Sequence, residues 1–186
     1  MKNHIVPAIR LTLFCAVFFC GFYTLSILGI AQFAPNKGKG EIVSAEGKIH
    51  HINVAQNFTQ DSYFWPRPSA VDYNGAGSGG SNKGPSNPDY LAEVEARIDS
   101  FLLKNPGIDR KDIPSEMVTS SGSGLDPHIS VAAAKIQVKR IAKARNLPEQ
   151  KITSIIKDNT EKPLLGFLGT EKINVLQLNL ALNNLK

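Results

Sequence analysis

A long uncharged stretch near the amino terminus limits what this chain can fold into. Residues 11–34 (LTLFCAVFFCGFYTLSILGIAQFA) carry no charged side chain over 24 positions. A helix rises about 1.5 Å per residue, so this stretch can cross a hydrocarbon core of roughly 30 Å. A cleaved secretory signal is the alternative, because 31–34 (AQFA) resembles a cleavage site. The apolar part of a signal is usually about 7–15 residues, so the length favours an uncleaved transmembrane helix.

The apolar stretch divides the chain into a cytoplasmic head at 1–10, a transmembrane helix at 11–34 and an extracytoplasmic domain at 35–186. Charge alone does not orient the helix, because basic residues lie on both sides of it, at 2 and 10 and at 37 and 39. A short basic head normally stays inside, whereas long domains cross largely regardless of charge. We therefore expect a single-pass protein with its amino terminus in the cytoplasm.

Cysteine use and net charge exclude several classes of protein. Cys15 and Cys20 both lie in the apolar stretch, so the domain that follows has neither a disulfide framework nor a thiolate metal site. The formal net charge of +5 is too small to indicate a nucleic-acid partner.

The domain is predicted to be a mixed α+β fold, with a short strand region and then several helices. Residues 35–40 (PNKGKG) form a flexible exit from the membrane, and branched residues at 48–54 favour a strand or hairpin. Apolar spacing and caps predict helices at 88–104, at 131–145, after Pro148 and after Asn174. The last segment also alternates, so a strand remains an alternative there. The helix at 131–145 carries a basic side that we expect to be solvated or to meet an acidic partner: Lys135, Lys139, Arg140 and Lys143.

A glycine-rich loop matches a nucleotide-binding pattern in letters only. Residues 75–80 (GAGSGG) read as G-x-G-x-x-G, but that motif must follow a buried strand and open a helix. Here it runs into 81–85 (SNKGP), which cannot open a helix at that point. We interpret it as a flexible loop, and we assign no cofactor-binding residue.

Two further groups of residues are of types found in catalytic or metal sites, but their spacing along the chain argues against both roles. Ser123, Asp126 and His128 lie within six residues, whereas a catalytic triad is assembled from separate elements. We expect a turn that leads to a cap at Ser130. His50 and His51 are adjacent, so on a strand they point to opposite faces and cannot share a metal. We therefore predict neither a catalytic nor a metal site.

The segment 63–70 (YFWPRPSA) has the composition of a recognition surface. Three aromatic residues and an arginine are framed by prolines, and aromatic side chains with arginine are enriched at interfaces. The alternative is a loop that folds back onto its own core. Trp65 is the expected anchor, with Arg67 held outward. The interface candidates are Tyr63, Phe64, Trp65, Arg67, Tyr73, Asn74, Ser78 and Asn82.

Several motifs, taken in order, resemble one family. The sequence has YFWPRPSA at 63–70, SGGSN at 78–82, VTSSGSGLDPHIS at 118–130, GFLG at 166–169 and NVLQLNLAL at 174–182. Together they resemble the C subunit of the Kdp high-affinity potassium-transporting ATPase, the KdpC family, from the membrane span to the end of the chain. Members often carry a proline midway along the span, which 22–25 (FYTL) lacks, and often a Gly-Arg pair where 162–163 is Lys-Pro.

The resemblance implies an accessory subunit rather than an enzyme. Its partners would be a channel-like A subunit, a P-type ATPase B subunit and a very small F subunit in the bacterial inner membrane, with ATP and potassium handled by the complex. The family's C subunit is described as a catalytic chaperone that raises affinity for ATP. A cap over the potassium entrance agrees better with the expected topology. The alternatives are a membrane-anchored binding module unrelated to transport and an anchored hydrolase.

Overall fold

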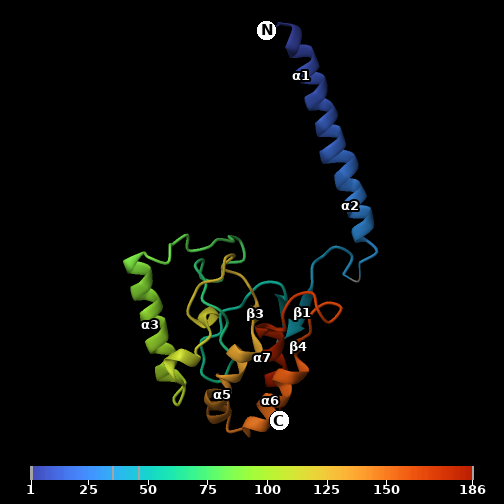
Figure 1. The fold of residues 1–186 in the computed structure, drawn as a ribbon. Coiled ribbons are helices and arrows are strands. Elements are labelled where there is room, and N and C mark those ends of the chain that lie inside the picture. Colours follow the sequence, from blue (N-terminus) through green and yellow to red (C-terminus); the bar gives the residue numbers. More distant parts are fainter. Residues whose placement is uncertain (1, 35, 46, 186) are drawn as a thin grey trace. The chain divides into compact units, whose positions relative to one another are not determined.

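The computed structural model describes residues 2–34, 36–45 and 47–185, which form two compact units. One unit extends to Ile42, and the other begins at Val43 and contains the folded domain. Figure 1 shows the order of the elements along the chain. The two units are described separately.

The first unit is a long helix. It consists of α1 (Lys2–Cys15), a π-helical stretch η1 (Ala16–Tyr23) and α2 (Thr24–Ala31). Residues 4–31 are long and apolar enough to cross a membrane; their most apolar window has a mean hydropathy of 2.2, and none of that window is buried. The helix therefore confirms the predicted apolar span, but it begins within the predicted head and ends three residues before position 34. Of the predicted exit at 35–40, Pro35 lies outside the described residues, and turns follow it.

Two hydroxyl groups inside this helix bond to its own backbone. The Thr24 hydroxyl donates to the carbonyl of Phe19 at 2.9 Å, and the Ser26 hydroxyl donates to the carbonyl of Phe22 at 2.8 Å. Such internal bonds remove the cost of placing polar groups in hydrocarbon.

The second unit begins with the predicted hairpin. Strands β1 (Ile42–Ala45) and β2 (Lys48–His51) pair in a two-stranded sheet, which confirms the strand region. Gly47, between the strands, has a φ of 76°, a backbone conformation that favours glycine in a tight turn.

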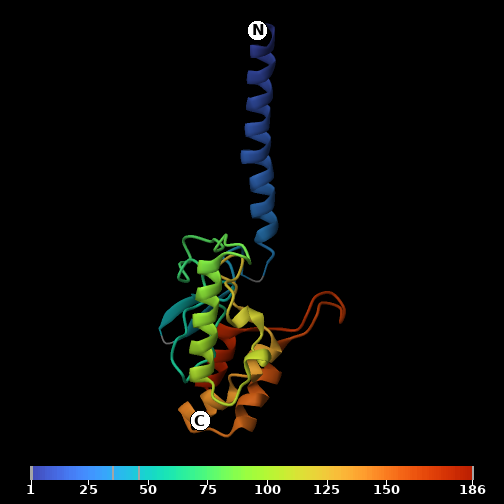
Figure 2. The ribbon, with the colours of Figure 1, turned by 60° about the vertical axis from the view of Figure 1, so that its left-hand side comes forward.

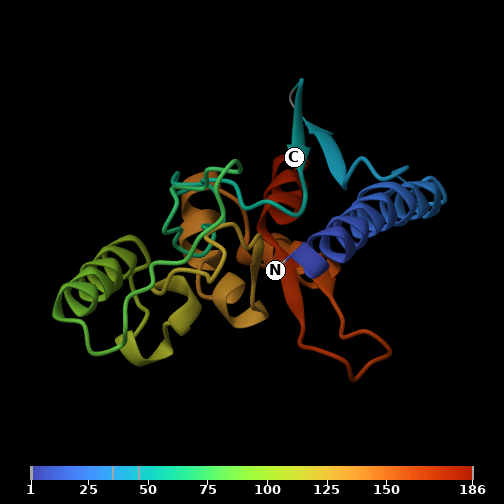
Figure 3. The same ribbon diagram turned by 90° about the horizontal axis from the view of Figure 1, so that it is seen from above.

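Helix α3 (Pro88–Lys104) confirms the predicted start and end. The Asn87 side chain accepts a bond from the Tyr90 amide at 3.0 Å, and Pro88 fills the first turn. The expected apolar face is only partly covered, since Phe101 is buried and Leu91 is exposed. Figures 1 and 3 show α3 at one side of the domain, apart from the helices near the carboxyl terminus.

The helix predicted at 131–145 is two helices, α4 (Val131–Lys135) and α5 (Val138–Arg145). The Ser130 cap is confirmed, because its hydroxyl accepts from the Ala133 amide at 3.1 Å. The helix is interrupted by a turn at 136–137. There the buried Gln137 side chain donates to the carbonyl of Ala133 at 3.0 Å. The expectation that Arg140 belongs to a solvated basic side is wrong, because α5 turns it into the interior.

The last two helices cover the core as predicted. Helix α6 (Glu149–Asp158) buries Ile152, Ile155 and Ile156. Helix α7 (Val175–Asn183) is capped by Asn174, which accepts from the Gln177 amide at 3.1 Å. The strand alternative for this segment is wrong.

A small antiparallel sheet was not predicted. It consists of β3 (His128–Ile129), β4 (Thr160–Glu161) and β5 (Lys172–Asn174) in the order β3-β5-β4. Strands of two or three residues are too short to show alternation, so the sequence gives no signal for them. Two 3₁₀ turns, η2 (Arg110–Asp112) and η3 (Ser115–Met117), lie between α3 and β3.

Candidate functional site

Three of the motifs that suggested the family resemblance, at 63–70, 78–82 and 118–130, meet at a contact between two loops. We call residues 58–82 the aromatic loop and residues 118–128 the serine loop. The Gly79 amide donates to the carbonyl of Ser123 at 2.9 Å, and the Ser69 hydroxyl donates to the carbonyl of Gly124 at 2.6 Å. The two loops are therefore joined by bonds to the backbone.

Gly124 is required by this contact. Its φ is 67°, and a Cβ there would lie 2.6 Å from Cγ2 of Val71 and 2.8 Å from the carbonyl oxygen of Gly79. The glycine-rich stretch 75–80 thus contributes to loop packing, and the next helix begins only at Pro88. This placement agrees with a loop rather than a phosphate cradle.

Buried amide side chains hold the backbone of the aromatic loop. Asn179 of α7 accepts from the Phe64 amide at 2.8 Å and donates to the Phe64 carbonyl at 3.0 Å. Gln137 accepts from the Trp65 amide at 2.8 Å. These bonds satisfy backbone groups that have no strand partner, as a buried segment requires.

Arg140 holds the same loop from the side. Its guanidinium donates to the carbonyls of Asp61 at 2.6 Å and Tyr63 at 3.0 Å, and to the side-chain oxygen of Asn105 at 3.0 Å. Its Cζ also lies 4.2 Å from the centre of the Trp65 ring, within cation–π range. Burial lowers the pKa of Arg140 to about 10, so the side chain stays charged at neutral pH.

The aromatic interface candidates pack against the domain, with Phe64 buried and Tyr63, Trp65 and Tyr73 partly buried. Phe64 is 0% exposed, so its inclusion among the interface candidates is wrong for the folded domain. The Trp65 indole packs edge-on against Phe101 and donates to the carbonyl of Gln60 at 3.0 Å. Tyr63 is half-buried beneath Arg145. The geometry favours the alternative, a loop folded onto its own core, for Phe64 and Trp65.

Arg67 is not held outward as expected, because it pairs with the serine loop. It lies 2.9 Å from Asp126, and its own carbonyl accepts from the Tyr73 hydroxyl at 2.8 Å. Asp126 also accepts from the His128 amide at 3.0 Å, and its oxygen lies 3.3 Å from Nδ1 of the His128 ring. Burial raises the pKa of Tyr73 to about 12. The polar candidates Asn74, Ser78 and Asn82 remain exposed.

The hydrogen bonds from His128 and the charge of Arg67 lower the pKa of Asp126 to about 2, although partial burial acts in the opposite direction. The unfolded value is about 3.9, so the carboxylate stabilises the fold above that pH and loses the effect as the pH falls through 2. We expect Asp126→Asn to lower the free energy of unfolding by about 0.5–1 kcal/mol at pH 7. The difference between variant and wild type should shrink as the pH falls from about 4 to about 2 in thermal melts.

Asp109→Asn is the matched control for this titration, because Asp109 is exposed and lies 3.5 Å from an equally exposed Lys111. A difference for Asp126→Asn that stayed constant between about pH 4 and about pH 2 would contradict the assigned role of the carboxylate.

The serine, aspartate and histidine of the serine loop form a turn. The Ser123 hydroxyl accepts from the Leu125 amide at 3.1 Å, while Asp126 is occupied by Arg67 and His128. This confirms the expected turn before the cap at Ser130. Among residues 2–34, 36–45 and 47–185, no group of three or more His, Cys, Asp or Glu side chains could hold a metal.

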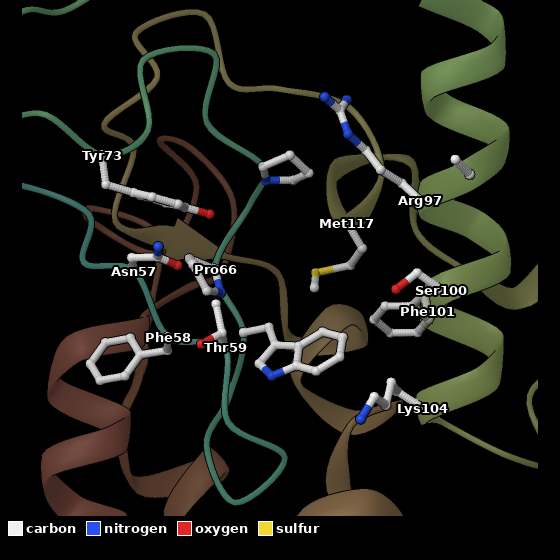
Figure 4. A pocket seen from close by; sticks show the side chains of 13 residues that line it. Asn57, Phe58, Thr59, Pro66, Tyr73, Arg97, Ser100, Phe101, Lys104 and Met117 are labelled. Atoms are coloured by element: carbon white, nitrogen blue, oxygen red, sulfur yellow. The ribbon is translucent and has the colours of Figure 1, made fainter.

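A groove of about 530 Å³ lies between the aromatic loop and α3 (Figure 4). Trp65, Tyr73, Phe101 and Met117 contribute its walls. Its two cations are already engaged: Arg97 donates to the carbonyl of Val118 at 3.1 Å, and Lys104 pairs with Asp61 at 3.2 Å. The groove is therefore mainly an apolar surface with paired charges at its edge.

The residues that organise this region were missed by reading the sequence. Each of them has a polar side chain that lies either on the apolar face of a helix or where a helix is interrupted. The sequence signal was available, because Asn179 lies between two leucines of a leucine-rich stretch (LQLNLAL) and Gln137 lies between two helical runs. The residues are Gln137, Arg140 and Asn179, all buried.

Comparison with known proteins shows one family over nearly the whole chain. The family model described as KdpC, the c chain of K⁺-transporting ATPase, matches residues 5–184. The potassium-transporting ATPase KdpC subunit of Flavobacterium psychrophilum is 54% identical over 187 residues, covering 100% of both chains. That of Bacteroides thetaiotaomicron is 54% identical over 96% of this chain and 97% of the relative. A more distant relative from Caldanaerobacter subterraneus is 45% identical over 98% and 95%.

Proposed function

This chain belongs to the KdpC family of potassium-transporting ATPase subunits, and from that membership we propose that it is a non-catalytic subunit anchored in the bacterial inner membrane. The observation that carries the proposal is the extent of the match, which includes both the membrane-length helix and the folded domain. A match to both parts supports a shared role for the anchor and the domain.

The proposed partners are the other subunits of the pump: the channel-like A subunit, the P-type ATPase B subunit and the small F subunit. The helix at 4–31 exposes apolar side chains along its length, as a segment in lipid or against other membrane helices should. On the domain, we propose that the exposed residues Asn74, Ser78 and Asn82 contact the channel-like subunit. Phe64 and Trp65 shape that surface from within, because they fix the loop that carries these residues.

A cap over the potassium entrance is the favoured role of the domain. With the amino terminus in the cytoplasm, residues after 42 lie outside, on the opposite side of the membrane from cytoplasmic ATP. Any effect on ATP affinity would then act through assembly of the complex rather than through direct contact with the nucleotide. The paired cations of the groove and the packed glycine-rich loop are consistent with this view.

Two measurements on the same cells test the proposal. Trypsin added outside spheroplasts should release the domain, because Lys37 and Lys39 are exposed in the segment between helix and domain. Tagged full-length chain, expressed with the other pump subunits and solubilised in mild detergent, should co-purify with the channel-like and ATPase subunits.

Full protection from external trypsin would overturn the proposed orientation and the cap. Release by trypsin without co-purification would overturn the pump role and favour the alternative, a membrane-anchored binding module unrelated to transport.

A further inference from the structure

The loop between β4 and β5 exposes four large apolar side chains in a row around one glycine. We call residues 164–168 (LLGFL) the apolar tip. Leu164, Leu165, Phe167 and Leu168 are 69%, 75%, 74% and 50% exposed. Figures 2 and 3 show this loop, in red-orange, extending away from the rest of the domain. Single exposed apolar residues are ordinary, but a contiguous apolar patch marks an interaction site.

The apolar tip is held in one conformation by its own backbone. The Leu164 amide donates to the Leu168 carbonyl at 3.0 Å, and the Leu168 amide donates to the Leu164 carbonyl at 2.9 Å. The Gly166 amide donates to the carbonyl of Pro163 at 2.9 Å. A loop ordered in this way loses little conformational entropy when it binds a partner.

Leu165 has a backbone conformation that does not suit leucine. Its φ is 55°, in the left-handed region where glycine or asparagine is more stable. The side chain is largely exposed, so packing within the domain does not compensate for the strain. Backbone strain that no contact within the domain offsets indicates that the Leu165 side chain contacts something outside the domain.

The charges at the base of the apolar tip favour a protein partner over lipid. Lys172 and Glu161 face each other across β4 and β5 and pair at 3.3 Å. Lys162 and Glu171, the adjacent residues in the sequence, also have opposite charges. The base therefore has no net charge, whereas segments that insert into an anionic bilayer surface are rich in lysine and arginine and often carry tryptophan. A neutral tip of leucine and phenylalanine matches an uncharged apolar pocket.

We infer that the apolar tip docks into an uncharged apolar pocket on the outer surface of a membrane-embedded subunit of the same ATPase. This inference rests on the proposed function. Four side chains form a contact too small to hold two free proteins together. A chain that is already anchored in the same membrane as its partner needs a smaller contact area, because tethering raises the effective concentration of the tip near its pocket.

The test uses full-length chain co-expressed with the other pump subunits. Leu165→Asn removes an apolar side chain but suits the positive φ, so the domain should melt at the same or a higher temperature. We expect this variant, and Phe167→Ser, to lower the co-purified fraction by about tenfold. Leu103→Ser is the matched control, because Leu103 is 80% exposed on α3, and it should co-purify like wild type.

A photo-crosslinking residue at position 167 identifies what the apolar tip touches. A covalent adduct with a subunit of the pump supports the inference. An adduct with lipid alone, or tip variants that co-purify like Leu103→Ser, would overturn it while wild-type co-purification leaves the proposed function intact. Wild-type chain that fails to co-purify would overturn the proposed function instead, together with the inference built on it.

Discussion

Replacing Arg140 with methionine is expected to lower the free energy of unfolding of the domain by about 3–5 kcal/mol. Methionine has a similar length but donates no hydrogen bond. The carbonyls of Asp61 and Tyr63 and the side chain of Asn105 would each lose a donor in a buried setting. Each unsatisfied buried acceptor costs about 1–3 kcal/mol, so replacing this one residue lowers the free energy of unfolding by a large amount.

The fluorescence emission of Trp65 reports directly on unfolding of the domain, because Trp65 is the only tryptophan in the sequence and lies under the Arg140 guanidinium. Denaturant titration of wild type and variant, followed by this emission, should show an earlier midpoint. Lys139→Met is the matched control, since Lys139 is the exposed neighbour on the same helix and should unfold like wild type. Equal midpoints for Arg140→Met and Lys139→Met would contradict the structural role of the guanidinium.

The second large effect is expected for Trp65→Ala, which should cost about 3 kcal/mol of domain stability. The indole fills space beside Phe101, stacks on Arg140 and donates to the carbonyl of Gln60. Truncation removes all three contacts and leaves a cavity that the prolines on either side of Arg67 hinder from closing. Because the variant lacks tryptophan, its unfolding is best followed by circular dichroism.

This variant also separates packing from partner contact. Thr59→Ala is the control, because Thr59 is exposed on the same loop and is not an interface candidate, so its loss should leave the melting temperature and co-purification unchanged. An unchanged melting temperature for Trp65→Ala together with lost co-purification would show that the indole is a partner anchor after all. A lower melting temperature would establish it as part of the core.

The features that the sequence predicted correctly are those that neighbouring residues decide. The membrane-length helix follows from a run of apolar residues, and the starts of α3, α4 and α7 follow from capping side chains at 87, 130 and 174. The buried face of α6 follows from spacing alone. In each case the physical cause acts within a few residues along the chain, so it is visible in the sequence.

The arrangement of the aromatic loop could not be read in the same way. Composition made an outward recognition surface and a packed loop equally reasonable for 63–65, because aromatic side chains suit both. The decision came from residues far along the chain: Gln137, Arg140 and Asn179 satisfy the backbone of this loop and so hold Phe64 and Trp65 inside. The apolar tip is the converse case, where apolar residues stay exposed because strands β4 and β5 carry them beyond the core.

The sequence by itself thus determined the helix of membrane length, the local caps and the family of the chain. The tertiary structure decided which aromatic residues are buried and which apolar residues stay exposed. Burial depends on contacts between segments that lie about 70 to 115 positions apart, as the bonds from Gln137 to Trp65 and from Asn179 to Phe64 show. Such contacts exist only once the chain has folded, and no local pattern encodes them.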